Sequence, residues 1–396
     1  MRLIVAYERL VARGGTETYT LTVADHLQRL GHDVTLYAHE VAALGAEAEE
    51  LGLRVVAGPL PPPGGCDAIV TQDRVLAYEL AHSHPRVPQA FVSHSELDYQ
   101  LPPVLEGVVG AVVVPHDRLR RRVEAMPLDV PVVRLRQPVD LQRFAPRRSP
   151  SPRPRRALLA GNYLRGPRRD LLVEALEAEG IEWTAIGRHG EGERDRLQDA
   201  MDAADLVAGK ARVIVEAMAC GRPAYVYDWN GCDGWVTPER YPVLEADNFG
   251  GQAEATGAGL ERVRADLASY DPAMGLANRD LAVANHSAMQ HAERLAGALA
   301  ALAPRPAAPA GPLREMARLA RANRRLELGD AGRVTELQRL HARIAALERE
   351  VEDVEEQRDD ARELWRAVEG FRASRRYRLA QAIAAPADLF RRRRRR

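Results

Sequence analysis

Lys210 is the only lysine among the 56 lysine and arginine residues of this 396-residue chain. It stands in the stretch GKARVIVEAMACGRP, residues 209–223, between an apolar run and a helical pattern. A compact ammonium group fits against a phosphate or sugar oxygen where the wider guanidinium fork of arginine does not. The position therefore predicts contact with a phosphate or a sugar, and a surface lysine retained by chance is the alternative.

Other polar residues follow apolar runs at the places where parallel sheets bind ligands, the carboxyl ends of their strands. Gly14 and Gly15 precede a helix, where exposed backbone N–H groups can bind an anion or a sugar hydroxyl. Arg165 and Arg168 lie in a basic loop at another helix start, which is unfavourable for cations unless an anion lies between them. His94 follows the run QAFVS, and a functional histidine and an ordinary hydrogen-bonded loop residue both fit that position.

Two common phosphate-binding motifs are excluded by the sequence. The GxGxxG fingerprint of nicotinamide dinucleotide sites is absent. The P-loop pattern GxxxxGK[ST] fails around Lys210, because Ala204 takes the place of its first glycine and Ala211 the place of its hydroxyl residue. Neither hydride transfer nor mononucleotide hydrolysis is therefore indicated.

Short apolar runs alternate with helix-length segments from the first residue to about residue 300. In the first half these runs are residues 3–7, 33–38, 53–57, 67–71, 89–93, 111–115 and 132–135. In the second half they are RALLAG, EWTAIG, DLVAG, AYVYD and YPVLEA. Runs that are apolar on both faces are typical of parallel strands in βα units. We therefore predict an α/β protein with two tandem Rossmann-like, doubly wound domains and a cleft between them.

Changes in composition mark the predicted boundaries. The first domain takes residues 1–145, the tract PRRSPSPRPRR (146–156) is a linker, and the second domain takes residues 157–303, closed by a long helix from about residue 275. Apolar residues at heptad spacing then predict a coiled coil over residues 313–370, and with it a homodimer. A single amphipathic helix folded back on the body is the alternative.

Residues 371–396 contain ten arginines and one aspartate, together with aromatic and aliphatic side chains. This mixture favours adsorption of the tail to an anionic membrane surface. Nucleic-acid binding ranks lower because apolar residues accompany the charges, and a solvated tail is the remaining alternative. The formal net charge of zero identifies no partner, and no run approaches the ~18 apolar residues of a membrane span.

Three cysteines are too few for a disulfide framework and lack metal-site spacing, so we predict no metal and a reducing, cytoplasmic location. Together with the basic tail, this predicts a protein at the inner face of the membrane.

Three segments resemble the group 1, or family 4, glycosyltransferases. GGTETYTLTVADHLQRLGHDVTLYA resembles the family's N-terminal signature, QPVDLQRFAP its segment before the linker, and ADLV with VEAMACGRPAYV its most diagnostic stretch in the second domain. The resemblance covers roughly residues 1–300. It implies the two-Rossmann GT-B fold and the transfer of a sugar from a nucleotide-sugar donor to an acceptor, with neither a metal ion nor another cofactor.

The resemblance also implies roles for individual residues. On the acceptor side it points to Gly14, Gly15, Glu17 and His94, and on the donor side to Arg165, Arg168, Gly187, Gly190 and Glu216. Gly209 and Lys210 occupy the loop where the family has another glutamate, and from there Lys210 could reach the donor diphosphate or a sugar hydroxyl. Glu216 matches the family's glutamate that binds the ribose of the donor. A carboxylate suits this role because it accepts hydrogen bonds from two vicinal hydroxyls. The alternative is an i, i+4 surface pair with Arg212. His94 and Lys210 are the catalytic candidates. The chain departs from the family at Ala208, where a glutamate that contacts the donor sugar is expected.

We therefore expect a glycosyltransferase that acts at the cytoplasmic membrane face on a cell-surface glycan or a lipid-linked acceptor, with retention at the anomeric carbon. A GT-B scaffold without turnover and a GT-B sugar-nucleotide epimerase or hydrolase are the alternatives.

Overall fold

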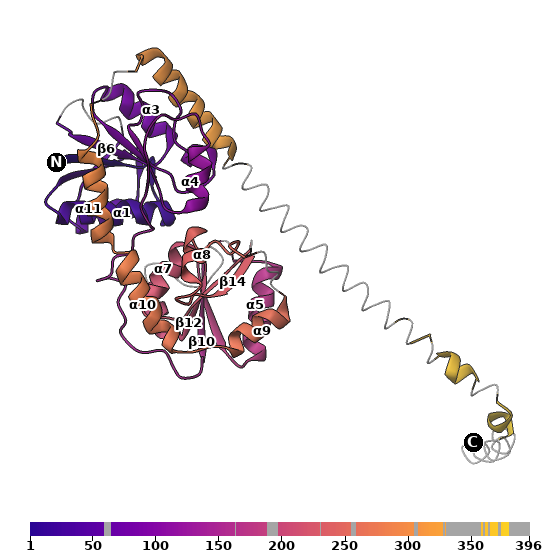
Figure 1. Cartoon of the computed structure of the whole chain (residues 1–396). Coiled ribbons are helices and arrows are strands. Elements are labelled where there is room, and N and C mark those ends of the chain that lie inside the picture. The colour runs from indigo at the N-terminus through magenta and orange to yellow at the C-terminus, as the bar shows by residue number, and fades with distance from the viewer. Residues whose placement is uncertain are drawn as a thin grey trace, which may run out of the picture. The chain divides into compact units, whose positions relative to one another are not determined.

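The computed structural model describes residues 1–58, 65–162, 164–187, 197–229, 231–254, 259–304, 308–327, 329, 358, 361–362, 365–370 and 374–379. The chain divides into two compact units, Met1–Asp330 and Ala331–Arg396. The first unit contains two α/β domains, each built on its own sheet (Figure 1). The prediction of two Rossmann-like domains is confirmed.

The first sheet has seven parallel strands in the order β5-β3-β1-β6-β7-β8-β9. They are β1 (Arg2–Ala6), β3 (Asp33–Ala38), β5 (Arg54–Ala57), β6 (Ala68–Thr71), β7 (Gln89–Val92), β8 (Ala111–Val114) and β9 (Val132–Arg134). The helices between them are α1 (Gly15–Arg29), α2 (Ala43–Glu50), α3 (Arg74–Ser83) and α4 (Asp117–Glu124), with a 3-10 turn, η1, at Asp98–Gln100. A two-stranded ladder joins β2 (Arg9–Leu10) to β4 (Glu40–Val41). Side chains of the central strands are buried on both faces, as the apolar runs predict.

The second sheet has the order β11-β10-β12-β13-β14. Its strands are β10 (Arg156–Ala160), β11 (Glu182–Ile186), β12 (Leu206–Gly209), β13 (Ala224–Asp228) and β14 (Gly231–Trp235). Its helices are α5 (Pro167–Ala178), α6 (Leu197–Ala203), α7 (Arg212–Ala219), α8 (Tyr241–Ala246) and α9 (Leu260–Ala268). The prediction that YPVLEA is a strand is wrong, because this segment forms α8 with proline in its first turn. The fifth strand is instead β14, which pairs antiparallel with β13.

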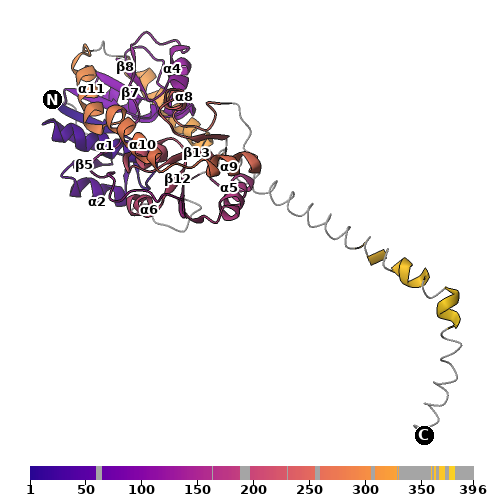
Figure 2. The ribbon, with the colours of Figure 1, turned by 60° about the horizontal axis from the view of Figure 1, so that its bottom comes forward.

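The long helix predicted from residue 275 is two helices, α10 (Ala273–Asn285) and α11 (Ala288–Ala300). The break falls at His286, whose ring Nδ1 hydrogen-bonds the backbone oxygen of Gln137 at 2.8 Å, and Ser287 caps α11. α11 belongs to the first domain, since its apolar side chains pack in the same core as α1 (Figures 1 and 2). The predicted closing helix of the second domain therefore crosses back to the first.

A further helix over residues 310–327 packs on the first domain as well. Leu313 and Ala317 are buried in a cluster with Phe91 of β7 and Leu119 of α4. The predicted coiled coil therefore does not begin at residue 313. The first residues assigned to it form a helix that folds back on the first domain, as the alternative predicted. Most of its remaining heptads lie outside the described residues.

In the second unit the described residues are helical at 365–370 and 375–379, with Trp365 and Val368 exposed. Residues 380–396 of the basic tail lie outside the described part of the chain. Among the helices that the structure describes, none combines the length and the apolar character that a membrane crossing requires.

Candidate functional site

A pocket of about 230 Å³ lies where the two domains of the first unit meet. The first domain lines it with the start of α1 and with part of α2. The second domain lines it with the carboxyl ends of β10, β11, β12 and β13 and with the start of α7. Of the predicted site residues, Gly14, Gly15, Lys210 and Glu216 lie on this wall. Carboxyl ends of parallel strands are where open α/β sheets bind their ligands.

Glycines end three adjacent strands of the second sheet. A Cβ atom on Gly187, after β11, would lie 2.2 Å from the carbonyl oxygen of Gly161, after β10. A Cβ atom on Gly209, the last residue of β12, would lie 2.6 Å from the carbonyl oxygen of Ala160. Only glycine allows these backbones to come so close, so Gly187 and Gly209 shape the floor of the pocket through packing.

The turn from β12 to α7 consists of two residues, Lys210 and Ala211. Ala211 has a φ of +50°, which is rare for a residue with a side chain, and α7 begins without a side-chain cap. A strained residue at the start of an uncapped helix is a frequent feature of ligand sites. Lys210 and Arg212 flank this helix start, where their charges oppose the helix dipole unless an anion lies between them.

Lys210 is held in place on two sides. Its ammonium nitrogen lies 2.8 Å from Oδ2 of Asp228, the last residue of β13, and 5.8 Å from the centre of the Trp229 ring. Asp228 is buried, whereas Trp229 is 44% exposed. Asp228 therefore fixes the position of the ammonium group at the mouth of the strands, and the Trp229 ring contributes a cation–π contact.

Glu216 forms an ion pair with Arg212, in which Nε donates to Oε1 at 2.7 Å. This is the i, i+4 pair considered as an alternative to the ribose role, but both side chains are buried and line the pocket. A second nitrogen of Arg212 donates to Oγ1 of Thr22 on α1 at 3.3 Å, across the domain junction, while Nη1 is buried without a partner among the described residues. Burial lowers the pKa of Arg212.

His94 is not on the pocket wall. Its Nε2–H donates to Oε1 of Gln72 at 2.8 Å, and the edge of its ring packs on Tyr19 of α1. Burial, with a smaller contribution from Arg212, lowers the pKa of His94 to about 3. The ring is therefore neutral near pH 7 and contacts α1 instead of lining the pocket, and its catalytic role stays a prediction.

The remaining predicted residues divide between the pocket and its surroundings. The carboxylate of Glu17 folds back over Gly14 in the first turn of α1 and is not on the wall. Arg165 and Arg168 are not on it either, and the backbone oxygen of Arg168 accepts a hydrogen bond from Tyr227 at 2.8 Å. Gly190 lies outside the described residues.

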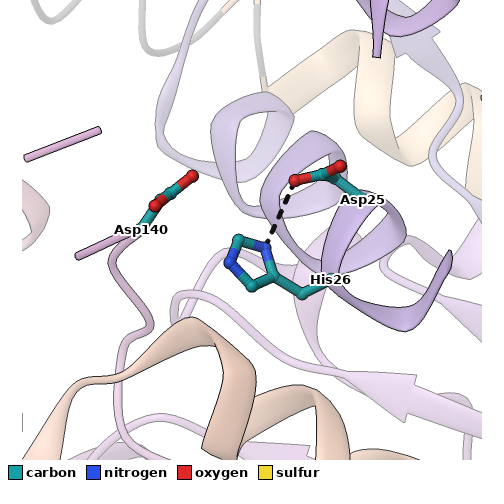
Figure 3. A group of neighbouring side chains, drawn as sticks. All are labelled: Asp25, His26 and Asp140. Atoms are coloured by element: carbon teal, nitrogen blue, oxygen red, sulfur yellow. Dashed lines mark ion pairs between the residues drawn. The ribbon is translucent and has the colours of Figure 1, made fainter. Parts of the chain in front are cut away.

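Asp25, His26 and Asp140 bring potential ligand atoms for a metal within 4.8 Å of one another (Figure 3). His26 Nδ1 lies 3.5 Å from Asp25 and 2.8 Å from the backbone oxygen one turn earlier. Asp25 accepts from Nε of Arg29 at 3.1 Å, and Asp140 from the backbone N–H of Arg143 at 3.1 Å. These bonds account for the three side chains, and we assign no ion to them.

Several wall residues were missed by sequence reasoning. Arg13 and Arg143 both pair with Glu47 of α2, and Asp228 pairs with Lys210. Asp228 had a usable signal, since it is the acid at the carboxyl end of the run AYVYD.

The wall carries five carboxylates and four cations, so it offers hydrogen-bond acceptors as well as donors. Such a wall suits a ligand that combines phosphate oxygens with hydroxyl groups.

Ala208 lies inside β12, paired with Leu159 and Tyr225 and fully buried. The position where the resembling family has a glutamate is therefore inside a strand in this chain. The short turn that follows this strand presents Lys210 to the pocket.

Neither a protein-family model nor a curated protein matches this sequence. Solved structures match its fold. HepE of Anabaena in complex with UDP-glucose is similar with a TM-score of 0.56 at 14% identity, over 76% of this chain and 100% of its own. A glycosyltransferase of Rickettsia africae is similar with a TM-score of 0.52 at 14% identity, over 75% of this chain and 97% of its own. This likeness establishes the architecture, which is the two-Rossmann GT-B fold.

Proposed function

We propose that this chain is a glycosyltransferase of the group 1 type that uses a nucleotide-sugar donor. The observation that carries the proposal is the start of α7, where Lys210 and Arg212 flank a strained, uncapped helix N-terminus inside the interdomain pocket. A diphosphate at this place would lie between the two cations and against the helix dipole. The GT-B fold supports the proposal, since HepE with the same architecture binds UDP-glucose.

The roles of the wall residues follow from their chemistry. Lys210, positioned by Asp228, stabilises the negative charge that grows on the departing nucleoside diphosphate. Glu216 accepts hydrogen bonds from donor hydroxyls and holds the guanidinium of Arg212 in place. Gly14 and Gly15 open α1 on the opposite wall, where backbone N–H groups face the ligand. The reaction needs neither a metal ion nor a cofactor in this scheme, and it retains the anomeric configuration.

The acceptor in this proposal is a cell-surface glycan or a lipid-linked saccharide at the cytoplasmic membrane face. The arginines and apolar residues of segment 371–396 support this location, and the heptads between residues 331 and 370 support a homodimer.

Removing residues 371–396 should move the protein from the membrane fraction to the soluble fraction, and an unchanged distribution would reject the tail as an anchor.

The test is an assay of the full chain with a panel of nucleotide-sugars, beginning with UDP-glucose, and with membrane extract. We expect nucleoside diphosphate release together with transfer of labelled sugar, unchanged by a chelator. Lys210→Arg should lower turnover at least about tenfold, because a planar guanidinium paired with Asp228 spreads its charge and does not present a compact ammonium to the departing phosphate. Donor binding without turnover would favour a scaffold, and release without transfer would favour a hydrolase.

A further inference from the structure

A second pocket, of about 460 Å³, lies on the first domain. Residues that follow β1, β3 and β5 line it, so it opens at the carboxyl edge of the sheet. Its other wall is the helix over residues 310–327, which contributes Arg321, Arg324 and Arg325. We call this space the arginine pocket.

The arginine pocket has more positive than negative side chains. Arg9 joins the three arginines of the helix, while Glu8 and Glu40 are the carboxylates on the wall. Arg9 pairs with Glu40 at 2.9 Å, and Arg324 pairs with Glu8. Arg321 pairs with Glu79 of α3, which is not itself on the wall. Arg325 is exposed and makes no ion pair within the described part of the chain. After these three pairs, the excess positive charge of the wall is that of Arg325.

The paired arginines also keep hydrogen-bond donors. A guanidinium has five N–H groups, and one carboxylate uses at most two of them. Arg324 is held rigidly, because it is buried, pairs with Glu8 and lies 5.3 Å from the centre of the Tyr99 ring. Fixed guanidinium donors around an open space are the typical arrangement for binding a phosphate group.

The same segment of chain forms a wall of both pockets. Glu8 and Arg9 line the arginine pocket, and Arg13 and Gly14 line the interdomain pocket. Only a few residues separate the two positions, a distance of at most about 17 Å along an extended chain. A molecule with an anionic end in the arginine pocket can therefore extend toward the site where the donor is proposed to bind.

We propose that the arginine pocket binds a phosphate-type anion, and that this anion is part of the acceptor. The assignment to the acceptor rests on the proposed function, whereas the anion site rests on the pocket alone. The helix over residues 310–327 completes this site, because three of its arginines supply the wall that faces the strand ends.

Calorimetry with inorganic pyrophosphate tests the anion site. The measurement uses the full chain carrying Lys210→Ala, which removes a cation from the interdomain pocket and leaves the arginine pocket intact. We expect this protein to bind pyrophosphate, and the added change Arg325→Gln to weaken binding about tenfold. The matched control is Arg120→Gln, which removes an exposed arginine of α4 that lines neither pocket.

No binding to the Lys210→Ala protein, or equal affinity with and without Arg325, would overturn the anion site. Thermal unfolding of each variant verifies that the fold is kept. Competition by a short-chain, soluble phosphatidic acid then separates the sources of the anion. Displacement of pyrophosphate supports an acceptor phosphate, and pyrophosphate binding without displacement overturns that part of the proposal. Failure of the wild-type chain to bind any nucleotide-sugar of the panel would reject the proposed function and leave the anion site standing.

Discussion

At the scale of single residues, the pair of Arg212 and Glu216 determines the electrostatics of the interdomain pocket. Both side chains are buried, and the guanidinium also contacts Thr22 of the other domain. Charges in such a place are costly when unpaired, because burial removes their hydration. Glu216 therefore has a structural part as well as its proposed contact with donor hydroxyls.

Glu216→Ala should lower the free energy of unfolding by about 3 kcal/mol, because Arg212 is left buried without its counter-charge. Urea unfolding followed by circular dichroism measures the loss. Glu124→Ala is the matched control, since Glu124 forms an i, i+4 pair with Arg120 on the exposed face of α4. This control should lose less than about 0.5 kcal/mol. Equal losses in the two variants would contradict the account of a buried pair.

At the scale of elements, Gly187, which follows β11, lets the ends of β11 and β10 lie close together. Gly187 has a φ of +140°, and a Cβ atom there would lie 2.2 Å from a backbone oxygen of the neighbouring strand end. Gly187→Ala should therefore cost about 3 kcal/mol of stability and weaken donor binding. Gly297→Ala, in α11 with no atom within 4 Å of the new Cβ, should gain up to about 1 kcal/mol. If thermal unfolding shows no loss of stability in Gly187→Ala, the close packing of these strand ends is refuted.

The strands were largely predictable, because parallel strands bury both faces and appear as continuous apolar runs. Eleven of the twelve predicted runs coincide with strands, and YPVLEA is the exception. Its apolar run is too short to separate a strand from a helix by periodicity, and the proline in its first turn was the signal that favoured a helix. The break at His286 was not predictable, since it depends on a hydrogen bond to Gln137, far away in the chain.

The candidate site was predictable only where position along a strand determines it. Lys210, Gly14 and Gly15 were found because they follow strands or open helices. The partners of the cations were not found, because the contacts of Glu47 with Arg13 and Arg143 join distant segments. For the same reason, spacing alone did not reveal that helix 310–327 covers the first domain.

At the scale of the whole molecule, buried histidines lie along the junction of the domains. Burial lowers the pKa of His94 to about 3 and those of His286 and His291 to about 4. His286 joins the domains, since Nε2 contacts the Tyr241 hydroxyl of α8 at 3.0 Å and Nδ1 the backbone oxygen of Gln137 at 2.8 Å. Because the unfolded chain binds these protons more readily, stability should fall as the pH drops from about 6.5 toward 4.

His94→Gln should flatten this acid slope by up to about 1.4 kcal/mol per pH unit, as measured by urea unfolding across the pH range. Asp73 provides a control of opposite sign. Burial raises the pKa of Asp73 to about 7, so its stabilising contribution is complete below the ordinary carboxyl pKa and is lost as the pH rises through about 7. Asp73→Asn should therefore make the slope between about pH 4 and 7 steeper. An unchanged slope in both variants would contradict the burial of these groups.

The return of the chain to its first domain has a consequence for biosynthesis. The core around α1 includes Ala292, Leu295 and Leu299 of α11, and the cluster beside β7 and α4 includes Leu313 and Ala317. When the first 145 residues leave the ribosome, both apolar surfaces are uncovered. Of the two domains, the one that is translated earlier is therefore completed later, and its exposed surfaces need protection until Ala317 has been made.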